Sequence, residues 1–311
     1  MENFVTLFNS VFLPQGICLH KSMERHLSDY QLWILCVDDE SYSILEKMNL
    51  PNVRILKLSD IETPELIKSK TGRTIVEYCW TLTPFAPRFV FDADISIDRV
   101  TYIDADIWFR KDPKPIFDEF IASGKSVLIT DHSYAPDCDD TATSGQYCVQ
   151  FMIFVRDDGE FVRKWWEDRC IEWCFARFED GKFGDQQYLS DWPERFAADV
   201  HVLQNNDLAL APWNAFRFSY GKSVFYHFQG LRLISSNRVD IGNYLLPTLL
   251  RQYVYQPYLE DMREAISCLK RLGVTLVPQA KPRGLPERFY RRLRRFMSKV
   301  RPYLADLEIT F

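Results

Sequence analysis

Two carboxylates that stand one residue apart, Asp104 and Asp106, are the residues best suited by type and spacing to do chemistry. They follow VTYI at residues 100–103, a run of β-branched and aromatic residues that is typical of a buried strand. Carboxylates at the end of a strand can face one crevice, where their oxygen atoms suit a hard divalent cation that also binds a diphosphate. The alternative is a polar turn, in which each Asp bonds only its own backbone.

An earlier Asp-Ala-Asp sequence, at Asp92 and Asp94, competes for this role. It follows RFVF and precedes ISIDR, which suits a turn that leads into the next strand. Residues 107–109 on the far side of Asp106 are apolar, as a central strand requires. We therefore favour Asp104 and Asp106 over the earlier pair.

The elements that must position the carboxylates are predicted from short apolar runs that alternate with helical patterns. Strands are expected at residues 4–8, 31–37, 53–58, 99–109, 126–130 and 148–155. Helices are expected at residues 15–27, 41–50, 64–80 and 161–178, and the pattern is wholly helical from about residue 243. This alternation indicates an α/β chain with a doubly wound, mostly parallel sheet flanked by helices. Ligands of such sheets bind at the carboxyl ends of the strands.

Length and composition predict one principal domain with an appended C-terminal part. The 311 residues are 47% hydrophobic, enough to bury one large core. We assign the main domain to residues 1–242, a helical extension to 243–280 and a basic amphipathic tail to 281–311. The formal charge of −5 argues against nucleic acid as the main ligand of the surface. The tail has nine basic and three acidic side chains, a charge of +6, which leaves −11 on the other 280 residues.

The tail has the pattern of a helix that lies on a membrane surface. Five apolar residues share one helical face, namely Phe289, Leu293, Phe296, Met297 and Val300. Because arginines surround this face, residues 286–304 are expected to bind an anionic membrane, with each basic side chain adding up to about 1 kcal/mol. The alternatives are a basic helix packed on the domain and a dimer contact.

Other sequence features predict a cytoplasmic protein that is peripheral on the inner face of the cytoplasmic membrane. No stretch reaches the roughly 18 apolar residues that a membrane span needs. The N-terminus has an acidic residue where a signal peptide would be basic. The eight cysteines lie mostly in apolar runs, as reduced thiols do, and Cys170 and Cys174 lack a second ligand pair at zinc spacing.

Beyond these patterns, the chain resembles the nucleotide-diphospho-sugar transferases with a GT-A fold, and is similar to glycosyltransferase family 8 of the bacterial surface-polysaccharide type. The resemblance covers about residues 1–260 through eight segments in family order: VTLFNSVFLPQG, LWILCVDD, VEYCWTLTP, VTYIDADIWF, WWEDRCIEWC, GKFGDQQYLSDWP, LAPWN and FYHFQG. It implies a metal-dependent transferase of hexosyltransferase type, with a nucleoside-diphosphate donor, UDP by family expectation. The acceptor would be a hydroxyl of a glycan or of a lipid-linked molecule. The resemblance also implies Mn²⁺, with Mg²⁺ as the alternative, and retention of the anomeric configuration.

The same resemblance assigns a donor site residue by residue. The residues implied to line the nucleotide pocket are Thr6, Leu7 and Phe8. Asp104 and Asp106 would bind the metal, with Asp104 also near the ribose, and His227 would be the third metal ligand. Gly230 would let the backbone approach a phosphate closely. Arg232 stands, at a different spacing, in place of a family lysine that meets the diphosphate, and its guanidinium group can also bind phosphate.

Four further residues are candidates at the sugar and the acceptor. Asp185 and Gln186 match a family Asp-Gln pair that lies beside the anomeric carbon. Asp185 would accept hydrogen bonds from sugar hydroxyls, and Gln186 would place a neutral carbonyl beside an oxocarbenium-like transition state. Asp185 equally suits a helix N-cap, and the two roles are compatible. Asp131 and His132 follow a predicted strand, where His132 is either a base for an acceptor hydroxyl or part of a solvated loop.

Three other classes of protein compete with the transferase. A phosphatase of the haloacid dehalogenase type also has Asp-x-Asp at a strand end, but Trp108 stands where it expects Thr or Val. A sugar nucleotidyltransferase needs a glycine-rich triphosphate loop after its first strand, which FNSVFLPQG lacks. A catalytically inactive nucleotide-sugar-binding scaffold would show no turnover, and the intact Asp pair, His227 and Asp185 argue against it.

Overall fold

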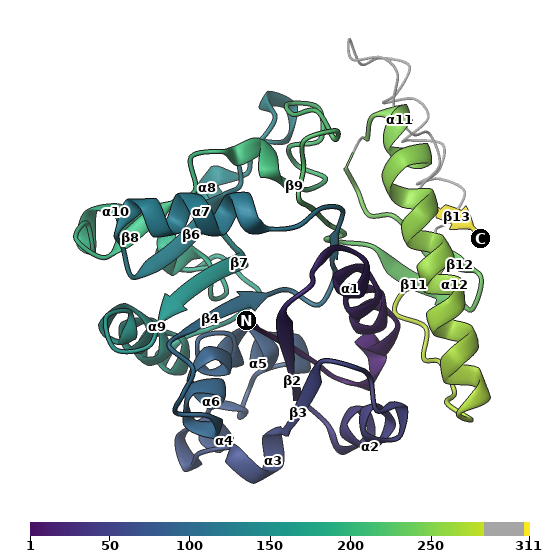
Figure 1. Cartoon of the computed structure of the whole chain (residues 1–311), viewed down its shortest axis with the longest axis horizontal. Helices are drawn as coiled ribbons and strands as arrows, with labels where there is room; N and C mark the ends of the chain where they lie inside the picture. Colours follow the sequence, from purple (N-terminus) through teal and green to yellow (C-terminus); the bar gives the residue numbers. More distant parts are fainter. Residues whose placement is uncertain (245, 283–307) are drawn as a thin grey trace.

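The computed structural model describes residues 1–244, 246–282 and 308–311, and a seven-stranded sheet of strand order β3-β2-β1-β4-β7-β6-β8 lies at its centre (Figure 1). Its strands are β1 (Glu2–Phe8), β2 (Tyr30–Cys36), β3 (Val53–Lys57), β4 (Arg99–Ile103), β6 (Val127–Asp131), β7 (Tyr147–Val155) and β8 (Val200–Val202). Neighbouring strands are parallel except at β7, which runs antiparallel to both β4 and β6. The expected α/β, mostly parallel sheet is confirmed.

Burial on both faces explains why the strands have continuous apolar sequences. In β1, Phe4 and Phe8 belong to the hydrophobic cluster on one face of the sheet, and Val5 and Leu7 to the cluster on the other. Successive side chains of a strand point to opposite faces, so a strand covered on both sides needs apolar residues at nearly every position.

The stretch expected as one strand at residues 99–109 is two strands that belong to different sheets. The chain leaves the central sheet at the end of β4, turns at Asp104 and Asp106, and continues as β5 (Ile107–Phe109). β5 joins β10 (Phe225–His227) and β9 (Ala209–Leu210) in a three-stranded sheet. A third sheet consists of β11 (Arg232–Ser235), β12 (Arg238–Asp240) and β13 (Glu308–Thr310). The two carboxylates therefore lie where the chain passes between sheets.

Helices cover both faces of the central sheet (Figure 1). They are α1 (Leu13–His26), α2 (Asp39–Met48), α3 (Leu58–Ile61), α4 (Pro64–Ser69), α5 (Ile75–Leu82), α6 (Phe85–Ala93), α7 (Lys114–Ser123), α8 (Thr141–Ser144), α9 (Glu160–Glu172) and α10 (Trp192–Arg195). Short 3-10 helices span Ser10–Phe12, Pro136–Cys138, Gln187–Asp191 and Asn206–Leu208. Side chains of α1, α2 and α7 belong to the core on one face, and those of α5, α6 and α9 to the core on the other.

Two of the expected helices differ in extent from the sequence expectation. The helix expected at residues 64–80 is broken into α4 and α5 around Gly72, whose φ of +81° a continuous helix does not allow. Thr74 and Glu77 then form a capping box that starts α5. The helix expected at residues 161–178 ends at Glu172, because the chain beyond it is extended.

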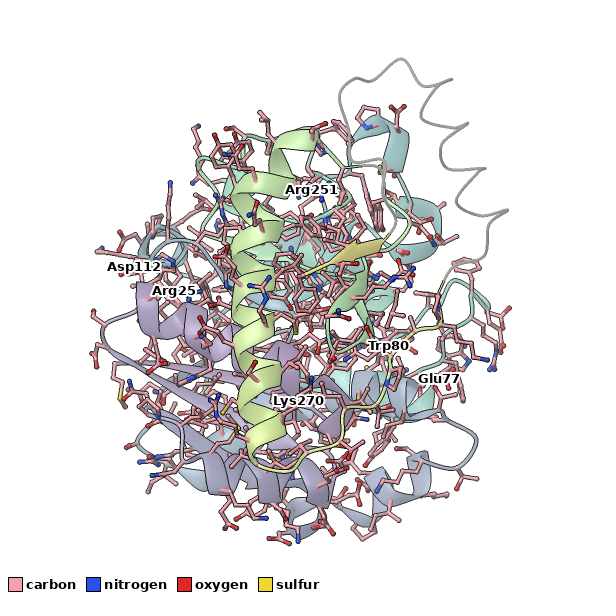
Figure 2. The ribbon with its side chains drawn as sticks, turned by 90° about the vertical axis from the view of Figure 1, so that its right-hand side faces the viewer. Arg25, Glu77, Trp80, Asp112, Arg251 and Lys270 are labelled. Atoms are coloured by element: carbon pink, nitrogen blue, oxygen red, sulfur yellow. The ribbon has the colours of Figure 1, made fainter. Side chains whose placement is uncertain are left out.

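A long helical stretch near the C-terminus packs on α1 (Figures 1 and 2). It comprises α11 (Thr248–Leu250), the π-helix Arg251–Tyr255 and α12 (Gln256–Arg271). In α12, Asp261 accepts hydrogen bonds from Arg25 Nη1 of α1 and Trp108 Nε1 of β5, each at 2.8 Å. The ring of Tyr258 stacks on Phe228, just after β10, with centroids 3.6 Å apart. α12 thus contacts both β5 and the end of β10.

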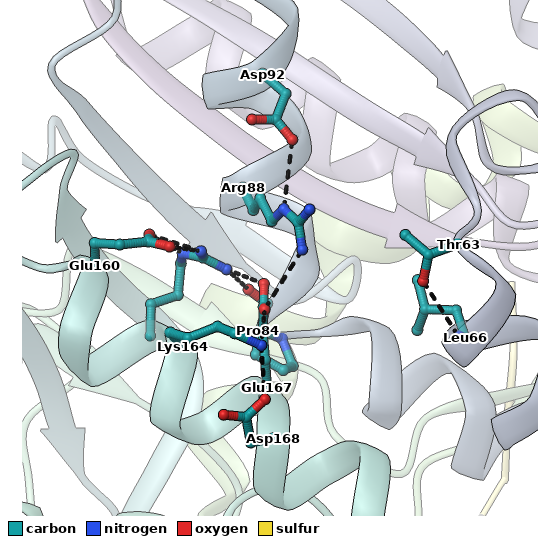
Figure 3. A network of polar contacts seen from close by, with 10 residues as sticks. Thr63, Leu66, Pro84, Arg88, Asp92, Glu160, Lys164, Glu167 and Asp168 are labelled. Atoms are coloured by element: carbon teal, nitrogen blue, oxygen red, sulfur yellow. Dashed lines mark hydrogen bonds and ion pairs between the residues drawn. The ribbon is translucent and has the colours of Figure 1, made fainter.

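A buried ion pair within α9 is hydrogen-bonded to the start of α6 (Figure 3). Arg163 and Glu167 are almost fully buried and form an ion pair within α9. Arg163 Nη1 also donates to the Pro84 carbonyl at 3.1 Å, and its Nη2 contacts Glu160 at 2.6 Å. Buried charges are tolerated only when they are paired and hydrogen-bonded, so this network fixes the backbone at Pro84.

The predicted membrane-binding residues 286–304 lie outside the described residues. The last described segment forms β13, where Ile309 is buried and pairs with Val239 of β12. Every helix in the described part of the chain is too short or too polar to cross a bilayer.

Candidate active site

The register between β5 and β10 places His227 beside the two carboxylates. The N–H of Asp104 donates to the carbonyl of Gln150 in β7 at 3.1 Å, which fixes the start of the turn after β4. β5 pairs antiparallel with β10, with Ile107 opposite His227. Because Asp106 directly precedes Ile107, its carboxylate lies next to the imidazole.

Two carboxylates and one imidazole converge at this point. His227 Nε2 lies 3.0 Å from Asp106 Oδ1 and 3.6 Å from Asp104 Oδ2. One potential ligand atom from each residue lies within 4.8 Å of the other two. Oxygen ligands suit Mg²⁺ and Mn²⁺, and imidazole suits borderline transition metals. The three residues therefore fit a divalent cation, and they are the ligands that the family resemblance implies.

Gln150, which the sequence analysis missed, orients the imidazole. His227 Nδ1 lies 2.9 Å from Gln150 Oε1, and Gln150 is fully buried. The rings of His227 and Trp213 also meet edge to face, with centroids 5.4 Å apart. The signal for Gln150 was a polar residue inside the apolar run CVQFMIFV.

Burial and charge act in opposite directions on the three converging groups. Burial lowers the pKa of His227, but the carboxylates of Asp106 and Asp104 raise this pKa above its ordinary value. Burial raises the pKa of Asp104. Burial alone would also raise the pKa of Asp106, but His227 and Arg232 hold this pKa below its usual range. A bound cation would favour the deprotonated form of all three groups, because a metal binds carboxylates and neutral imidazole.

The converging groups face a cleft of about 720 Å³. Leu7 and Phe8 at the end of β1 line this cleft, whereas Thr6 is fully buried and does not line it. Tyr102 of β4 also lines the cleft, and its hydroxyl donates to Asp104 Oδ1 at 2.9 Å. The cleft thus opens at the carboxyl ends of β1 and β4, the edge that the sheet topology predicts.

Asp185 and Gln186 lie in the same cleft. Asp185 is 3% exposed, and its Oδ2 atom has no hydrogen-bond partner among the described residues. Burial raises the pKa of Asp185 to about 7. The N-cap alternative is not seen, because the 3-10 helix that follows has Gln186 at its N-cap and no side-chain cap hydrogen bond. Gln186 Nε2 donates to the Ser144 carbonyl at 2.8 Å, which joins it to α8.

Arg232 lines the cleft, and Gly230 shapes the turn before it. Arg232 Nη1 lies 3.8 Å from Asp106 Oδ2, and its guanidinium carbon lies 5.0 Å from the centre of the Phe12 ring. Gly230 has a φ of +82°, which other residues rarely adopt. It does not line the cleft, although its neighbour Gln229 does.

His132 lines the cleft and Asp131 does not. Asp131 holds a loop, because its Oδ2 accepts from Gln146 Nε2 at 2.9 Å. The His132 ring stacks on Tyr134 with centroids 4.7 Å apart. Burial lowers the pKa of His132 to about 4, so the imidazole is neutral at pH 7 and a weak base.

The earlier Asp-Ala-Asp sequence lies at the end of α6 and does not line the cleft. Asp94 Oδ1 accepts from the Ser96 N–H at 3.0 Å, and Asp92 forms an ion pair with Arg88 at 3.4 Å. These are the local roles of a helix end and a turn, as expected for the less favoured pair.

Two bacterial proteins are similar to this chain over most of its length. The chain is 30% identical over 288 residues to the uncharacterized protein YfnF of Bacillus subtilis (strain 168), covering 86% of this chain and 94% of YfnF. It is 28% identical to the uncharacterized protein YfnD of the same organism, covering 85% of this chain and 89% of YfnD. No family model matches the chain.

Solved glycosyltransferases have the same fold. The galactosyltransferase LgtC, in complex with donor and acceptor sugar analogues, superposes with a TM-score of 0.53 at 12% identity over 89% of this chain and 98% of LgtC. Mouse xyloside xylosyltransferase 1 gives a TM-score of 0.50 at 12% identity over 73% of this chain and 97% of that enzyme. At these identities the likeness shows the fold and confirms the GT-A resemblance. Because the similarity covers 94% of YfnF at 30% identity, the chain belongs to the YfnF family. Its fold is that of the GT-A glycosyltransferases.

Proposed function

We propose that this protein is a metal-dependent glycosyltransferase that moves a sugar from a nucleoside-diphosphate donor, UDP by preference, to an acceptor hydroxyl. The observation that carries the proposal is the convergence of Asp104, Asp106 and His227 within 4.8 Å, in the same cleft as Asp185. A cation site beside a buried carboxyl group suits the transfer of a sugar away from a diphosphate.

The donor diphosphate is proposed to bind between the metal ligands and Arg232. Asp104, Asp106 and His227 would hold Mn²⁺ in preference to Mg²⁺, because the imidazole nitrogen favours the softer ion. When bound, the cation neutralises charge on the leaving diphosphate. Arg232, 3.8 Å from Asp106, adds a second positive group for the phosphates.

The sugar is proposed to lie beside Asp185 and Gln186. The bond between the anomeric carbon and the β-phosphate oxygen breaks, and its electron pair leaves with the diphosphate. A bond from the acceptor oxygen to the same carbon forms, and the proton of the acceptor hydroxyl passes to the departing diphosphate oxygen. Asp185 accepts hydrogen bonds from sugar hydroxyls, for which its Oδ2 atom is available, since no described residue hydrogen-bonds to it. Retention of configuration is the outcome that the family resemblance favours.

The acceptor is proposed to be a glycan or a lipid-linked molecule that enters beside His132. Residues 286–304 would then hold the protein on an anionic membrane where such an acceptor lies. Sedimentation with vesicles of anionic and neutral lipid tests this part. Equal binding to both kinds of vesicle, or to neither, would contradict it.

The test of the proposed function is a panel of nucleotide sugars incubated with the protein, with and without Mn²⁺, while free nucleoside diphosphate is measured. We expect slow, metal-dependent release from one donor, because water can replace the acceptor. Metal-dependent hydrolysis of p-nitrophenyl phosphate without donor cleavage would favour the phosphatase. Donor binding without any release, with every acceptor tried, would favour the scaffold.

A further inference from the structure

The chain after α12 forms part of the candidate active site. Residues 277–279 line the cleft. The sequence analysis assigned them to a helical extension, but they lie beyond α12, which ends at Arg271. Figure 2 shows the chain leaving the lower end of α12, near Lys270, and running back across the molecule. The N–H groups of Gln279 and Ala280 donate to the Leu233 carbonyl of β11 at 2.7 and 3.1 Å. The extension therefore supplies one wall of the cleft.

The side-chain amide of Gln279 joins this wall to two other segments. Its Nε2 atom donates to the Val11 carbonyl at 2.7 Å, and its Oε1 atom accepts from the Leu233 N–H at 2.9 Å. It also pairs with the amide of Gln15, which is fully buried in α1, through contacts of 2.7 and 3.1 Å. An amide has two donor hydrogens and two acceptor lone pairs, so each hydrogen-bonding position of Gln279 is used.

These contacts hold the backbone next to two residues that line the cleft. Val11 precedes Phe12, and Leu233 follows Arg232. The Arg232 guanidinium group lies over the Phe12 ring, with its carbon 5.0 Å from the ring centre, in a cation–π contact. Gln279 therefore joins the segment that carries Phe12 to the segment that carries Arg232.

We propose that Gln279 is a positioning residue for donor binding, which keeps the Arg232 guanidinium group on Phe12 and directed at the donor diphosphate. The proposal rests on the proposed function, because it takes a nucleoside diphosphate as the anion that Arg232 meets. A guanidinium group that is already held in place loses less conformational freedom when the anion binds. Loss of Gln279 therefore weakens donor binding although this residue need not touch the donor.

The variants that test this role are Gln279→Met and Gln279→Glu. Met keeps a similar volume without hydrogen bonds, whereas Glu keeps an acceptor for the Leu233 N–H but cannot donate to Val11. Gln204→Ala is the matched control, because Gln204 is an exposed amide whose Nε2 donates to a nearby carbonyl, that of Val202, at 2.7 Å. The measurement is calorimetric titration with UDP and Mn²⁺, together with KM and kcat for the donor that the panel identifies.

We expect both Gln279 variants to bind UDP about tenfold more weakly, a loss of roughly 1.4 kcal/mol in binding free energy. Their KM for the donor should rise while kcat stays nearly unchanged. The Gln204→Ala control should bind UDP as the unaltered protein does. Arg232→Met completes a double-mutant cycle, and adding Gln279→Met to it should weaken binding no further. Additive losses in this cycle would overturn the positioning role, as would an unchanged Kd in a folded Gln279 variant. If the unaltered protein binds UDP, GDP, CDP and ADP equally poorly, the proposed function fails instead.

Discussion

His227 Nδ1 lies 2.9 Å from Gln150 Oε1, inside the protein. An amide oxygen only accepts hydrogen bonds, so Nδ1 carries the proton of the neutral ring and Nε2 presents its lone pair to the space beside Asp104 and Asp106. A buried amide in β7 thus selects the tautomer that can bind a metal.

Replacing this amide should weaken metal binding. In Gln150→Leu the imidazole loses its acceptor, and we expect Mn²⁺ affinity to fall about 10- to 100-fold. Calorimetric titration with Mn²⁺ measures the change, and Gln204→Leu serves as the exposed control. Unchanged affinity in a folded Gln150→Leu protein would show that Gln150 does not orient the ligand.

Asp185 should make the stability of the metal-free protein fall as the pH rises. Its folded-state pKa of about 7 lies above the ordinary value of 3.8. The protonated Asp185 side chain therefore contributes its full stabilisation of the folded state below about pH 4. This contribution is lost as the pH rises to about 7, where Asp185 must release its proton in the folded protein. Asp185→Asn removes this titration, and the variant should be more stable than the unaltered protein at pH 7.5 by up to roughly 4 kcal/mol.

Urea unfolding of both proteins at pH 4 and pH 7.5 measures this difference. The same variant should lose most donor turnover, because the sugar loses an ionisable acceptor. A stability difference that is the same at both pH values would argue against a buried, titrating carboxyl group.

Breaking the buried ion pair in α9 should destabilise the protein strongly. Arg163→Met leaves Glu167 buried without its close partner, so we expect a loss of about 3–5 kcal/mol in the free energy of unfolding. Lys114→Met is the control, because Lys114 is exposed in its pair with Asp118 one turn along α7, and it should cost less than about 1 kcal/mol. Similar losses in the two variants would contradict this distinction.

The sheet was predictable from the sequence because its strands are buried on both faces. β2 and β7 are nearly continuous apolar runs, and β1 is apolar from Phe4 to Phe8 except at Thr6. These runs can be recognised without knowing which strands pair. The break between α4 and α5 was missed because a helical pattern continues across Gly72, and only the φ of this residue reveals the turn.

Much of the candidate site could not be derived from spacing alone. His227 lies more than 100 residues after Asp106, and only the pairing of β5 with β10 brings them together. The sequence analysis placed His227 through the family resemblance. Gln279 gave no sequence signal, because its role depends on three segments that meet only in the folded protein.

The most direct test of the account compares the two Asp-Ala-Asp sequences of the same chain. Free nucleoside diphosphate released from the active donor is measured with and without Mn²⁺ for the unaltered protein, Asp106→Asn and Asp92→Asn. We predict that Asp106→Asn abolishes the metal-dependent release, while Asp92→Asn, which changes an exposed residue at the end of α6, leaves it intact. Release that survives in Asp106→Asn with the same dependence on Mn²⁺ would contradict the assignment of the metal site.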